Sequence, residues 1–322
     1  MHRIDDLDKL ILEQLLLDGR KSLVDIAKDC GVSSITIGKH FDKLKKEGII
    51  TGSTLQINYR HLGLNTVFTL NFRIRPDQSD EICQKIRRMK NLYILFQFQK
   101  FASAVFTLNN QEEMNSTKEE LKKIRVISDL KTYLWLDIRN QRENLDVLYE
   151  NARKSQNVTN LNSKEKINET KKVDELDIKL IDILSINSRM SFRDVSKQVD
   201  AAIDTISRRY ERLRRNGTIR AIIQINPQKL GYQAGWVVGI TFANEVSFKG
   251  AFEEYAKFKN CVFIIQTSGE TDLILIFLIK NLEEFLEIQD KLMKISSIQI
   301  LDSNITRLGN VYPYRREFIS TI

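Results

Sequence analysis

The chain carries one sequence unit twice, and this duplication restricts its fold more than any other feature. GRKSLVDIAKDCGVSSITIGKHFDKLKKEGII, at residues 19–50, returns in a looser form as SRMSFRDVSKQVDAAIDTISRRYERLRRNGTI at residues 188–219. Arg20 aligns with Arg189, an offset of 169 residues (189 − 20), and identities recur at that offset through the window. After one deletion the match resumes, with LQINYRHLG against IQINPQKLG. Such self-similarity indicates internal duplication, so the chain is predicted to contain two copies of a unit that itself has more than one domain.

Composition and charge favour a soluble protein with a polyanionic partner. The net charge is +8 and the pI is near 9.2, which favours acidic partners such as nucleic acid. The three cysteines lie far apart in the sequence and form no metal-type or redox-type pair, as expected in a reducing cytoplasm. The longest clean apolar run, Leu273 to Ile279, is far shorter than the roughly 20 residues that a membrane helix needs. We therefore expect a cytoplasmic, nucleoid-associated protein with no membrane contact, no cofactor and no metal.

The front of each copy is predicted to form a winged helix-turn-helix domain. In the first copy, apolar residues recur at helical spacing within residues 6–18 and 22–30. Ser33 or Ser34 is placed to cap a third helix that ends before Gly48. The next segment, TGSTLQI, is predicted to form a strand pair, the wing of the domain.

The back of each copy is predicted to alternate strands and helices in the order β-α-β-β-α-β, the ferredoxin-like arrangement. In the first copy the expected strands are 67–74, 92–98, 104–108 and 132–138, with helices at 79–89 and 112–127. In the second copy the expected strands are 236–242, 262–266, 273–279 and 298–306, with helices near 247–258 and 282–295. The predicted class is therefore α+β, with winged-helix domains at 1–63 and 173–231, ferredoxin-like domains at 64–140 and 232–322, and a polar linker with a short helix at 141–172.

The third helix of each front domain is the candidate DNA-binding element. Ile37, Phe41 and Leu44 form one apolar stripe that must be buried, and the second copy repeats it. The opposite face is predicted to meet DNA, with hydrogen-bonding residues at bases and cations at phosphates. The candidate residues are Ser34, Thr36, Lys39, His40 and Lys43 in the first copy, and Thr205, Ser207, Arg208, Arg209, Arg212 and Arg220 in the second. The alternative is that these are ordinary solvated helix faces.

The second copy differs from the first around its turn. Asp200 stands where the first copy has Gly31, and Asp204 lies near the start of the third helix. An acid at that point suits the positive end of the helix dipole but repels phosphate. It can instead accept a hydrogen bond from a cytosine amine. We expect Asp204 to act through the dipole and as a cap.

The pattern LDKLILEQLLLDGRKSLVDIAKDCGVSSITIGKHFDKLKKEGIITG followed by INYRHLG resembles the Lrp/AsnC family of transcription regulators. The second copy carries the same pattern more loosely, and the resemblance covers nearly the whole chain except the linker. It implies winged-helix domains that bind DNA and back domains that assemble and bind an amino-acid effector. Family members normally carry one such unit and form dimers, so this chain is expected to be a covalent pseudo-dimer, which can dimerise further.

The family's effector pocket involves a Gly-x-x-Asp pattern between the second and third strands of the back domain. The second copy has it, with Ser268, Gly269, Glu270 and Asp272 as candidates for binding a free amino acid. The first copy has Lys100 in place of the glycine, which argues against a site there. The alternative for the second copy is a plain hairpin turn built of turn-forming residues.

Three functions compete on these observations. The leading hypothesis is a sequence-specific DNA-binding transcriptional regulator and not an enzyme. The second is an architectural protein that coats DNA with little sequence preference. The third is an enzyme that resembles the siroheme decarboxylases, which use basic and histidine side chains. The chain has three histidines, none of them in either back half, which disfavours that chemistry.

Overall fold

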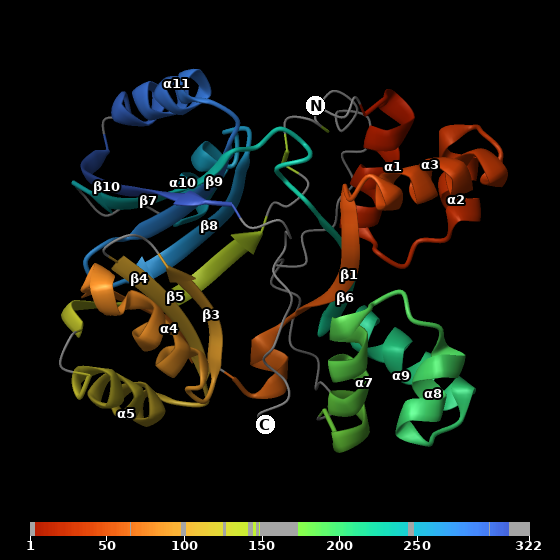
Figure 1. Ribbon diagram of the computed structural model, residues 1–322, viewed down its shortest axis with the longest axis horizontal. Coiled ribbons are helices and arrows are strands. Elements are labelled where there is room, and N and C mark those ends of the chain that lie inside the picture. Colours follow the sequence, from red (N-terminus) through yellow and green to blue (C-terminus); the bar gives the residue numbers. More distant parts are fainter. Residues whose placement is uncertain are drawn as a thin grey trace.

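The computed structural model describes residues 4–64, 66–97, 101–124, 127–140, 144, 145, 148, 173–243, 248–295 and 297–308. The predicted linker helix lies almost wholly outside these described residues. In Figure 1 the two front domains lie on one side of the molecule and the two back domains form a sheet with its helices on the other. Among the described residues no helix has the length and apolarity needed to cross a bilayer.

Each front domain contains three helices, as predicted. They are α1 (Asp6–Leu17), α2 (Leu23–Cys30) and α3 (Ser34–Lys46) in the first copy, and α7 (Glu175–Ile186), α8 (Phe192–Val199) and α9 (Ile203–Arg215) in the second. Side chains cap most of these helices. Asp5 and Asp8 form a reciprocal capping box on α1, and Ser33 caps α3 by accepting from the Thr36 amide. The start of α9 differs, because its cap residue Ala202 has no side-chain hydrogen bond.

The turn before α9 corrects one sequence-based expectation. Asp204 lies inside the first turn of α9 and does not cap it, so the expected capping role is wrong, while its place in the first turn suits the helix dipole. Asp200 has φ 51° and Gly31 has φ 67°, so the residues at this equivalent position adopt the left-handed conformation in both turns. Asp200 therefore adopts a conformation that favours glycine, at a small cost in stability.

The predicted wing is wrong in its pairing. β1 (Ile50–Ile57) does not fold back within its own domain but pairs antiparallel with β6 (Ile219–Ile225) of the second copy. Thr54 faces Ile222 near the middle of this ribbon. The two residues are equivalent in the repeat, so the ribbon has approximate two-fold symmetry. It stands between the two winged-helix domains in Figure 1.

Each strand of the ribbon is buried in the hydrophobic core of the other copy. Ile223 and Ile225 from β6 are buried with the helices of the first copy. Leu55 and Ile57 from β1 are buried with the helices of the second copy. Each winged-helix core is thus completed by a strand of the other unit, as in a domain-swapped dimer.

The two back domains follow the predicted β-α-β-β-α-β order. The first comprises β2 (Thr66–Ile74), α4 (Ser79–Arg87), β3 (Leu92–Gln97), β4 (Phe101–Leu108), α5 (Gln111–Lys122) and β5 (Ile127–Asn140). The second comprises β7 (Ala234–Phe242), α10 (Phe248–Tyr255), β8 (Cys261–Ser268), β9 (Leu273–Ile279), α11 (Leu282–Met293) and β10 (Ile298–Arg307). The described residues also include two short 3-10 turns, Tyr59–Leu62 and Pro76–Gln78. The predicted helix 112–127 is wrong at its end and the predicted strand 132–138 at its start, because α5 ends at Lys122 and β5 begins at Ile127.

The back domains join into one eight-stranded sheet within the chain, in the order β10-β7-β9-β8-β5-β2-β4-β3. The junction is the antiparallel pair β5–β8, which runs from Leu134 opposite Ser268 to Asn140 opposite Phe263. The sequence left open whether the back domains pair within one chain or between two. In this structure they pair within the chain, which makes the protein a covalent pseudo-dimer at both its sheet and its ribbon.

Candidate nucleic-acid interface

The predicted apolar stripes are the buried faces of both recognition helices. Ile37 and Leu44 of α3 are fully buried, and Phe41 is half-buried. Ile206, Tyr210 and Leu213 of α9 are buried in the same way. These stripes pack against the other two helices of each domain. The stripe therefore decides which face of each helix is available to DNA.

Four of the predicted DNA-binding side chains contact acids at the start of the first helix of their own domain. In the first copy, Asp8 accepts hydrogen bonds from the Lys43 ammonium at 2.7 Å and from the His40 ring at 2.8 Å. The Asp8 side chain is 0% exposed, and those of His40 and Lys43 are 23% and 37% exposed. We call Asp5, Asp8, His40 and Lys43 the first acid–cation cluster.

The second copy repeats this arrangement with arginines. Arg209 donates to both oxygens of Asp174, at 2.7 and 2.6 Å, and to Asp177 at 2.9 Å. Arg212 also donates to Asp177, whose side chain is fully buried. We call Asp174, Asp177, Arg209 and Arg212 the second acid–cation cluster. Acids therefore accompany His40, Lys43, Arg209 and Arg212 on the flanks of the two recognition helices, and their contact with DNA stays a prediction.

Electrostatics explain how a buried carboxylate is tolerated in the first cluster. Burial alone would raise the pKa of Asp8, but hydrogen bonds from Lys43 and His40 outweigh it, so the pKa lies below its ordinary value of 3.8. The hydrogen bond to Asp8 in turn raises the pKa of Lys43. In the second cluster, the hydrogen bond from Arg209 lowers the pKa of Asp174.

The first cluster also has the composition of a metal site, since ligand atoms of Asp5, Asp8 and His40 lie within 4.8 Å of one another. Two observations favour a purely structural role. The Lys43 ammonium already contacts Asp8, and the second copy places the Arg209 guanidinium where the first has the His40 ring. A side-chain cation therefore occupies the position that a metal would take.

The remaining candidates lie on or beside the outward faces of the recognition helices. Ser34, Lys39 and Arg208 are exposed, and Thr36 and Thr205 are partly exposed at the helix starts. Ser207 is half-buried on the flank of α9. Arg220 is also half-buried, and it lies on the ribbon, opposite Gln56. The charge of the two helices also includes Lys45, Lys46, Arg214 and Arg215, which are exposed but were not named as candidate contacts. Helical spacing from Ile37 and Ile206 places Lys46 and Arg215 on the outward faces, whereas Lys45 lies over the Phe41 ring and Arg214 lines the hollow between the domains.

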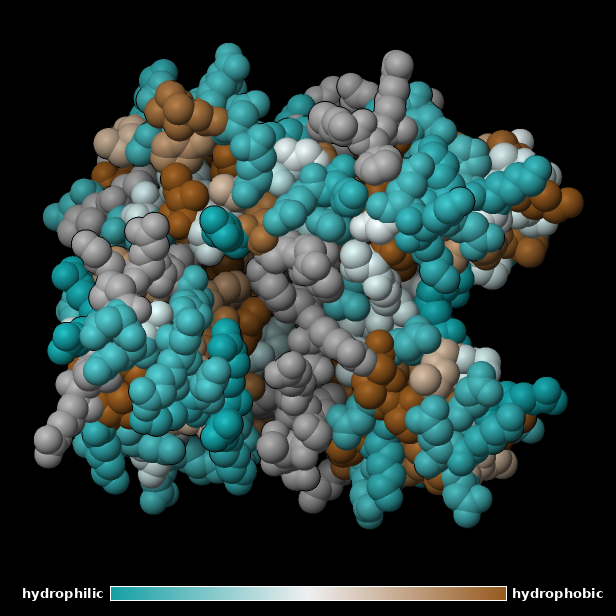
Figure 2. Space-filling model, in the orientation of Figure 1, coloured by the Kyte–Doolittle hydropathy of each residue, from teal (hydrophilic) through white to brown (hydrophobic). Residues whose placement is uncertain are grey.

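The two helix-turn-helix tips differ in character. In the first copy Val24, Val32 and Ile35 are exposed, Ile35 by 71%. The equivalent positions in the second copy are Arg193, Ala201 and Asp204. Figure 2 shows apolar surface at the tip of the upper right lobe and mainly hydrophilic surface on the outside of the lower right lobe. The two recognition surfaces are therefore unlike, although their folds are alike.

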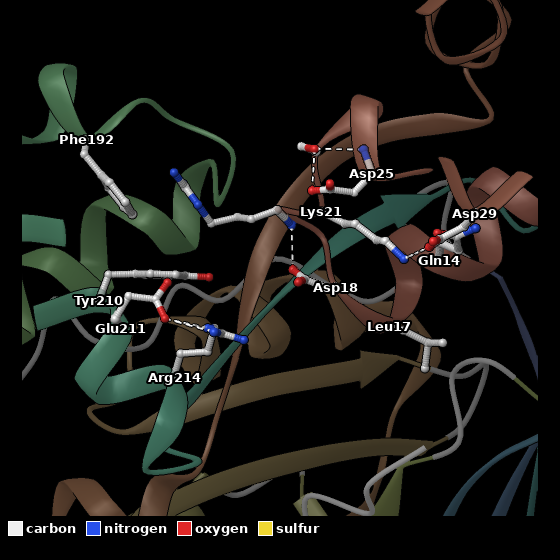
Figure 3. A pocket seen from close by; sticks show the side chains of 12 residues that line it. Gln14, Leu17, Asp18, Lys21, Asp25, Asp29, Phe192, Tyr210, Glu211 and Arg214 are labelled. Atoms are coloured by element: carbon white, nitrogen blue, oxygen red, sulfur yellow. Dashed lines mark hydrogen bonds and ion pairs between the residues drawn. The ribbon is translucent and has the colours of Figure 1, made fainter. Parts of the chain in front are cut away.

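A hollow of about 650 Å³ lies between the two winged-helix domains. Figure 3 shows Phe192 and Tyr210 of the second copy facing Asp18 and Lys21 of the first across it. Arg20 also lines this hollow. Its guanidinium donates to backbone carbonyls of the opposite domain, which no sequence pattern had indicated.

The predicted effector turn joins the two back domains. Gly269 has φ 143°, and a Cβ there would lie 2.6 Å from the Thr132 carbonyl oxygen on β5. Glu270 forms an ion pair with Lys131 at 2.6 Å. Asp272 accepts a hydrogen bond from the Phe242 amide at 2.9 Å. Ser268 ends β8 and pairs with Leu134 of β5, so all four candidates have contacts within the sheet, although all four stay exposed to solvent.

The paired helix-turn-helix domains, with their shared ribbon, define a protein of the winged-helix DNA-binding class. A model described as winged helix-turn-helix DNA-binding matches residues 4–51, and one described as the AsnC-type helix-turn-helix domain matches residues 173–214. The HTH-type transcriptional regulator LrpA of Pyrococcus horikoshii is 35% identical over 94 residues, which cover 28% of this chain and 67% of that regulator. An uncharacterised HTH-type transcriptional regulator of Pyrococcus abyssi is 28% identical over 134 residues, 41% of this chain and 90% of the relative. The chain belongs to the Lrp/AsnC family of helix-turn-helix transcriptional regulators.

A solved structure extends the likeness to both copies at once. The crystal structure of the siroheme decarboxylase NirDL aligns with a TM-score of 0.59 and 14% sequence identity, covering 94% of this chain and 91% of that chain. A second NirDL structure, in complex with an iron-uroporphyrin III analogue, has a TM-score of 0.61 and 12% identity. At this level of identity the likeness shows a shared fold and carries no inference about activity.

Proposed function

We propose that this regulator places its two unlike recognition helices on two half-sites of one DNA duplex. The observation that supports the proposal is the distribution of charge around each helix. Lys43, Arg209 and Arg212 form ion pairs with acids at the start of the first helix of their own domain. The outer cations Lys39, Lys46, Arg208 and Arg215 remain exposed on the face opposite the buried stripe. Exposed cations on a recognition helix suit the flanking phosphates.

Base recognition in this proposal differs between the halves. Ser34 and Thr36 can hydrogen-bond to base edges, and the exposed Ile35 suits the methyl group of thymine. In the second half, Thr205 can hydrogen-bond and Asp204 can accept from a cytosine amine. We therefore expect an asymmetric DNA site, in contrast to the palindrome that a symmetric homodimer recognises.

Selection of bound fragments from random DNA tests this proposal directly. The expected result is a motif of two unlike half-sites whose centres are separated by one helical turn or a multiple of it. A single symmetric palindrome would contradict the asymmetry. Enrichment of no motif, with binding retained, would favour the architectural function instead.

Alanine at Arg208 is expected to weaken DNA binding about tenfold and to lower the slope of log affinity against log salt by about one. The reason is the loss of one phosphate contact with its released counterions. Fluorescence anisotropy over a salt series measures both quantities. The matched control is Lys85→Ala, which removes an exposed cation from α4 in the back domain. An Arg208→Ala variant with the parent's affinity and slope would remove α9 from the interface.

We further propose that the chain has no catalytic role. The supporting observation concerns the two histidines that the structure describes, since histidines are candidates for proton transfer in a decarboxylase. His40 contacts Asp8 in the first acid–cation cluster, and His61 contacts Thr218 of the second copy. Burial also lowers the pKa of His61. A visible absorption spectrum of the purified protein is the test, since a bound tetrapyrrole would oppose this proposal.

The exposed turn at Ser268–Asp272 supports a second proposal, that a free amino acid binds there as effector. On this proposal the parent's melting temperature rises with one of the twenty amino acids, and that rise is lost in Asp272→Ala. The substitution also removes the hydrogen bond from Phe242, with a basal loss of about 1 kcal/mol. Asp290→Ala, at an exposed acid on α11, is the control. A parent that responds to no amino acid would contradict effector binding.

A further inference from the structure

Two arginines, one from each copy, cross between the winged-helix domains. Arg20 donates hydrogen bonds to the backbone carbonyls of Ser188 and Met190, the latter at 2.9 Å. Arg189 donates to the carbonyls of Gly19 and Lys21, at 2.6 and 3.3 Å. These acceptors hold equivalent positions in the repeat, so the exchange is reciprocal. We call Arg20 and Arg189 the crossed arginines.

Each crossed arginine also lies over an aromatic ring on the recognition helix of the opposite domain. The guanidinium carbon of Arg20 lies 5.1 Å from the ring centre of Tyr210 on α9, and 4.3 Å from that of Phe192. The guanidinium carbon of Arg189 lies 5.3 Å from the ring centre of Phe41 on α3. Cations attract aromatic faces at this range. Each arginine therefore connects the turn of its own domain to the recognition helix of the other domain.

The arrangement brings two like charges together, which requires compensation. Burial lowers the pKa of both guanidinium groups, and the charge of Arg20 lowers that of Arg189 further. The carboxylate of Asp18 acts in the opposite direction on both. Arginine stays charged regardless, so the pair is favourable only while its hydrogen bonds and ring contacts are made. The planar guanidinium presents its donors in fixed directions, so the contacts of the two arginines are made in only one relative placement of the domains.

The β1–β6 ribbon is packed into both winged-helix cores and joins the two domains. A two-stranded ribbon twists more strongly than a wider sheet. The recognition helices are attached on either side of the ribbon, so changes in its twist alter their separation. The crossed arginines add side-chain contacts between the domains beyond the backbone pairing of the ribbon, and these contacts oppose that movement.

We propose that Arg20 and Arg189 are positioning residues that set the separation of α3 and α9, and with it the half-site spacing that the protein accepts. This inference rests on the proposed binding of one duplex by both helices. Two linked binding modules gain affinity only when their geometry matches the spacing of their targets. The arginines thus determine specificity without touching DNA.

The test compares the parent with the double variant Arg20→Gln and Arg189→Gln on duplexes whose half-site spacing is changed one base pair at a time. The parent is expected to show a sharp optimum. The double variant is expected to bind about tenfold more weakly at that optimum and to discriminate little between spacings. Its affinity for a duplex with a single half-site should equal the parent's, which a misfolded protein would not achieve. The Arg→Lys pair should recover part of the preference, and an unchanged spacing profile in the glutamine variant would overturn the proposal.

A measurement without DNA separates this inference from the proposed function. Spin labels at Lys46→Cys and Arg215→Cys report the distance between α3 and α9, in a Cys30→Ser background with Cys83 and Cys261 buried. A narrow distribution is expected in the parent and a broad one in the glutamine double variant. Equal widths would overturn the positioning role. A parent that binds no DNA would refute the proposed function, while the distance distributions would still decide the role of the arginines.

Discussion

Replacing Asp8 with asparagine is expected to lower the free energy of unfolding by about 3 kcal/mol. The Asp8 carboxylate is fully buried and accepts from three donors, the Lys43 ammonium, the His40 ring and the Asp5 amide. Asparagine offers one carbonyl oxygen and directs an NH2 group at the remaining donors. Urea denaturation measures the loss, and hydrogen exchange at amides of α1 and α3 should place it in the first winged-helix domain.

The matched control is Asp6→Asn on the same helical turn. The Asp6 side chain is 84% exposed and contacts only Lys9 among the residues described, so its loss should cost less than about 0.5 kcal/mol. Equal losses in the two variants would contradict the structural role of Asp8.

The pH dependence of the same variant gives an independent check. The folded-state pKa of Asp8 lies below the ordinary value of 3.8. Its stabilising contribution is therefore complete above the pKa of the unfolded chain and is lost as the pH falls through the lower folded value. The stability difference between parent and Asp8→Asn should shrink as the pH falls below 3.8.

The helices of the front domains were predictable because their signals are local. Ser22 and Ser33 cap α2 and α3 through bonds to residues three positions away. The stripe of Ile37 and Leu44 follows the helical period. The pairing of β1 was not predictable, because the alternation of apolar and polar residues along a strand does not identify the strand that it pairs with. Its partner β6 lies more than half the chain away. In the junction of β5 with β8, paired residues such as Asn140 and Phe263 are more than 120 positions apart.

The residues of the candidate interface also fall into those that helical spacing predicts and those that it does not. Helical spacing placed Lys39 and Arg208 on the outward face, where the structure has them. It could not assign His40 and Lys43, which lie on the flank of α3, because their acidic partner Asp8 is 32 and 35 residues away. A signal did exist, since both copies repeat an acid at the start of the first helix and cations at these two positions. In the structure these acids also form the capping boxes of the first helices.

The effector turn shows how a motif can have a structural explanation that the sequence does not reveal. The resemblance to the family suggested that Gly269 leaves room for a ligand. In the structure the missing side chain leaves room for the Thr132 carbonyl of the other back domain. The first copy has Lys100 at the equivalent position, which lies outside the described residues.

Replacing Gly19 with alanine is expected to destabilise the protein by about 3 kcal/mol. A Cβ at this position would lie 2.5–2.6 Å from backbone atoms of Ile222 on β6, far inside normal contact. Ile222 is fixed by its pairing with Thr54 in the ribbon, and the Gly19 amide donates to the Ala221 carbonyl at 2.7 Å. Neither backbone can withdraw without breaking this bond and disturbing the ribbon that completes both winged-helix cores. Urea denaturation should report the loss, and limited proteolysis should show both front domains becoming susceptible together.

The repeat provides the control, because Ser188 holds the position equivalent to Gly19. Its amide lies 3.4 Å from the Ser53 carbonyl, so the chain is farther from the ribbon there and already accommodates a Cβ. Ser188→Ala removes only a hydroxyl whose bond to the Ile222 carbonyl is 3.4 Å long, at a cost of less than about 1 kcal/mol. Equal losses in the two variants would mean that both turns are equally crowded. A loss confined to Gly19→Ala would instead establish that close approach to the other copy's strand, and not the turn itself, requires glycine.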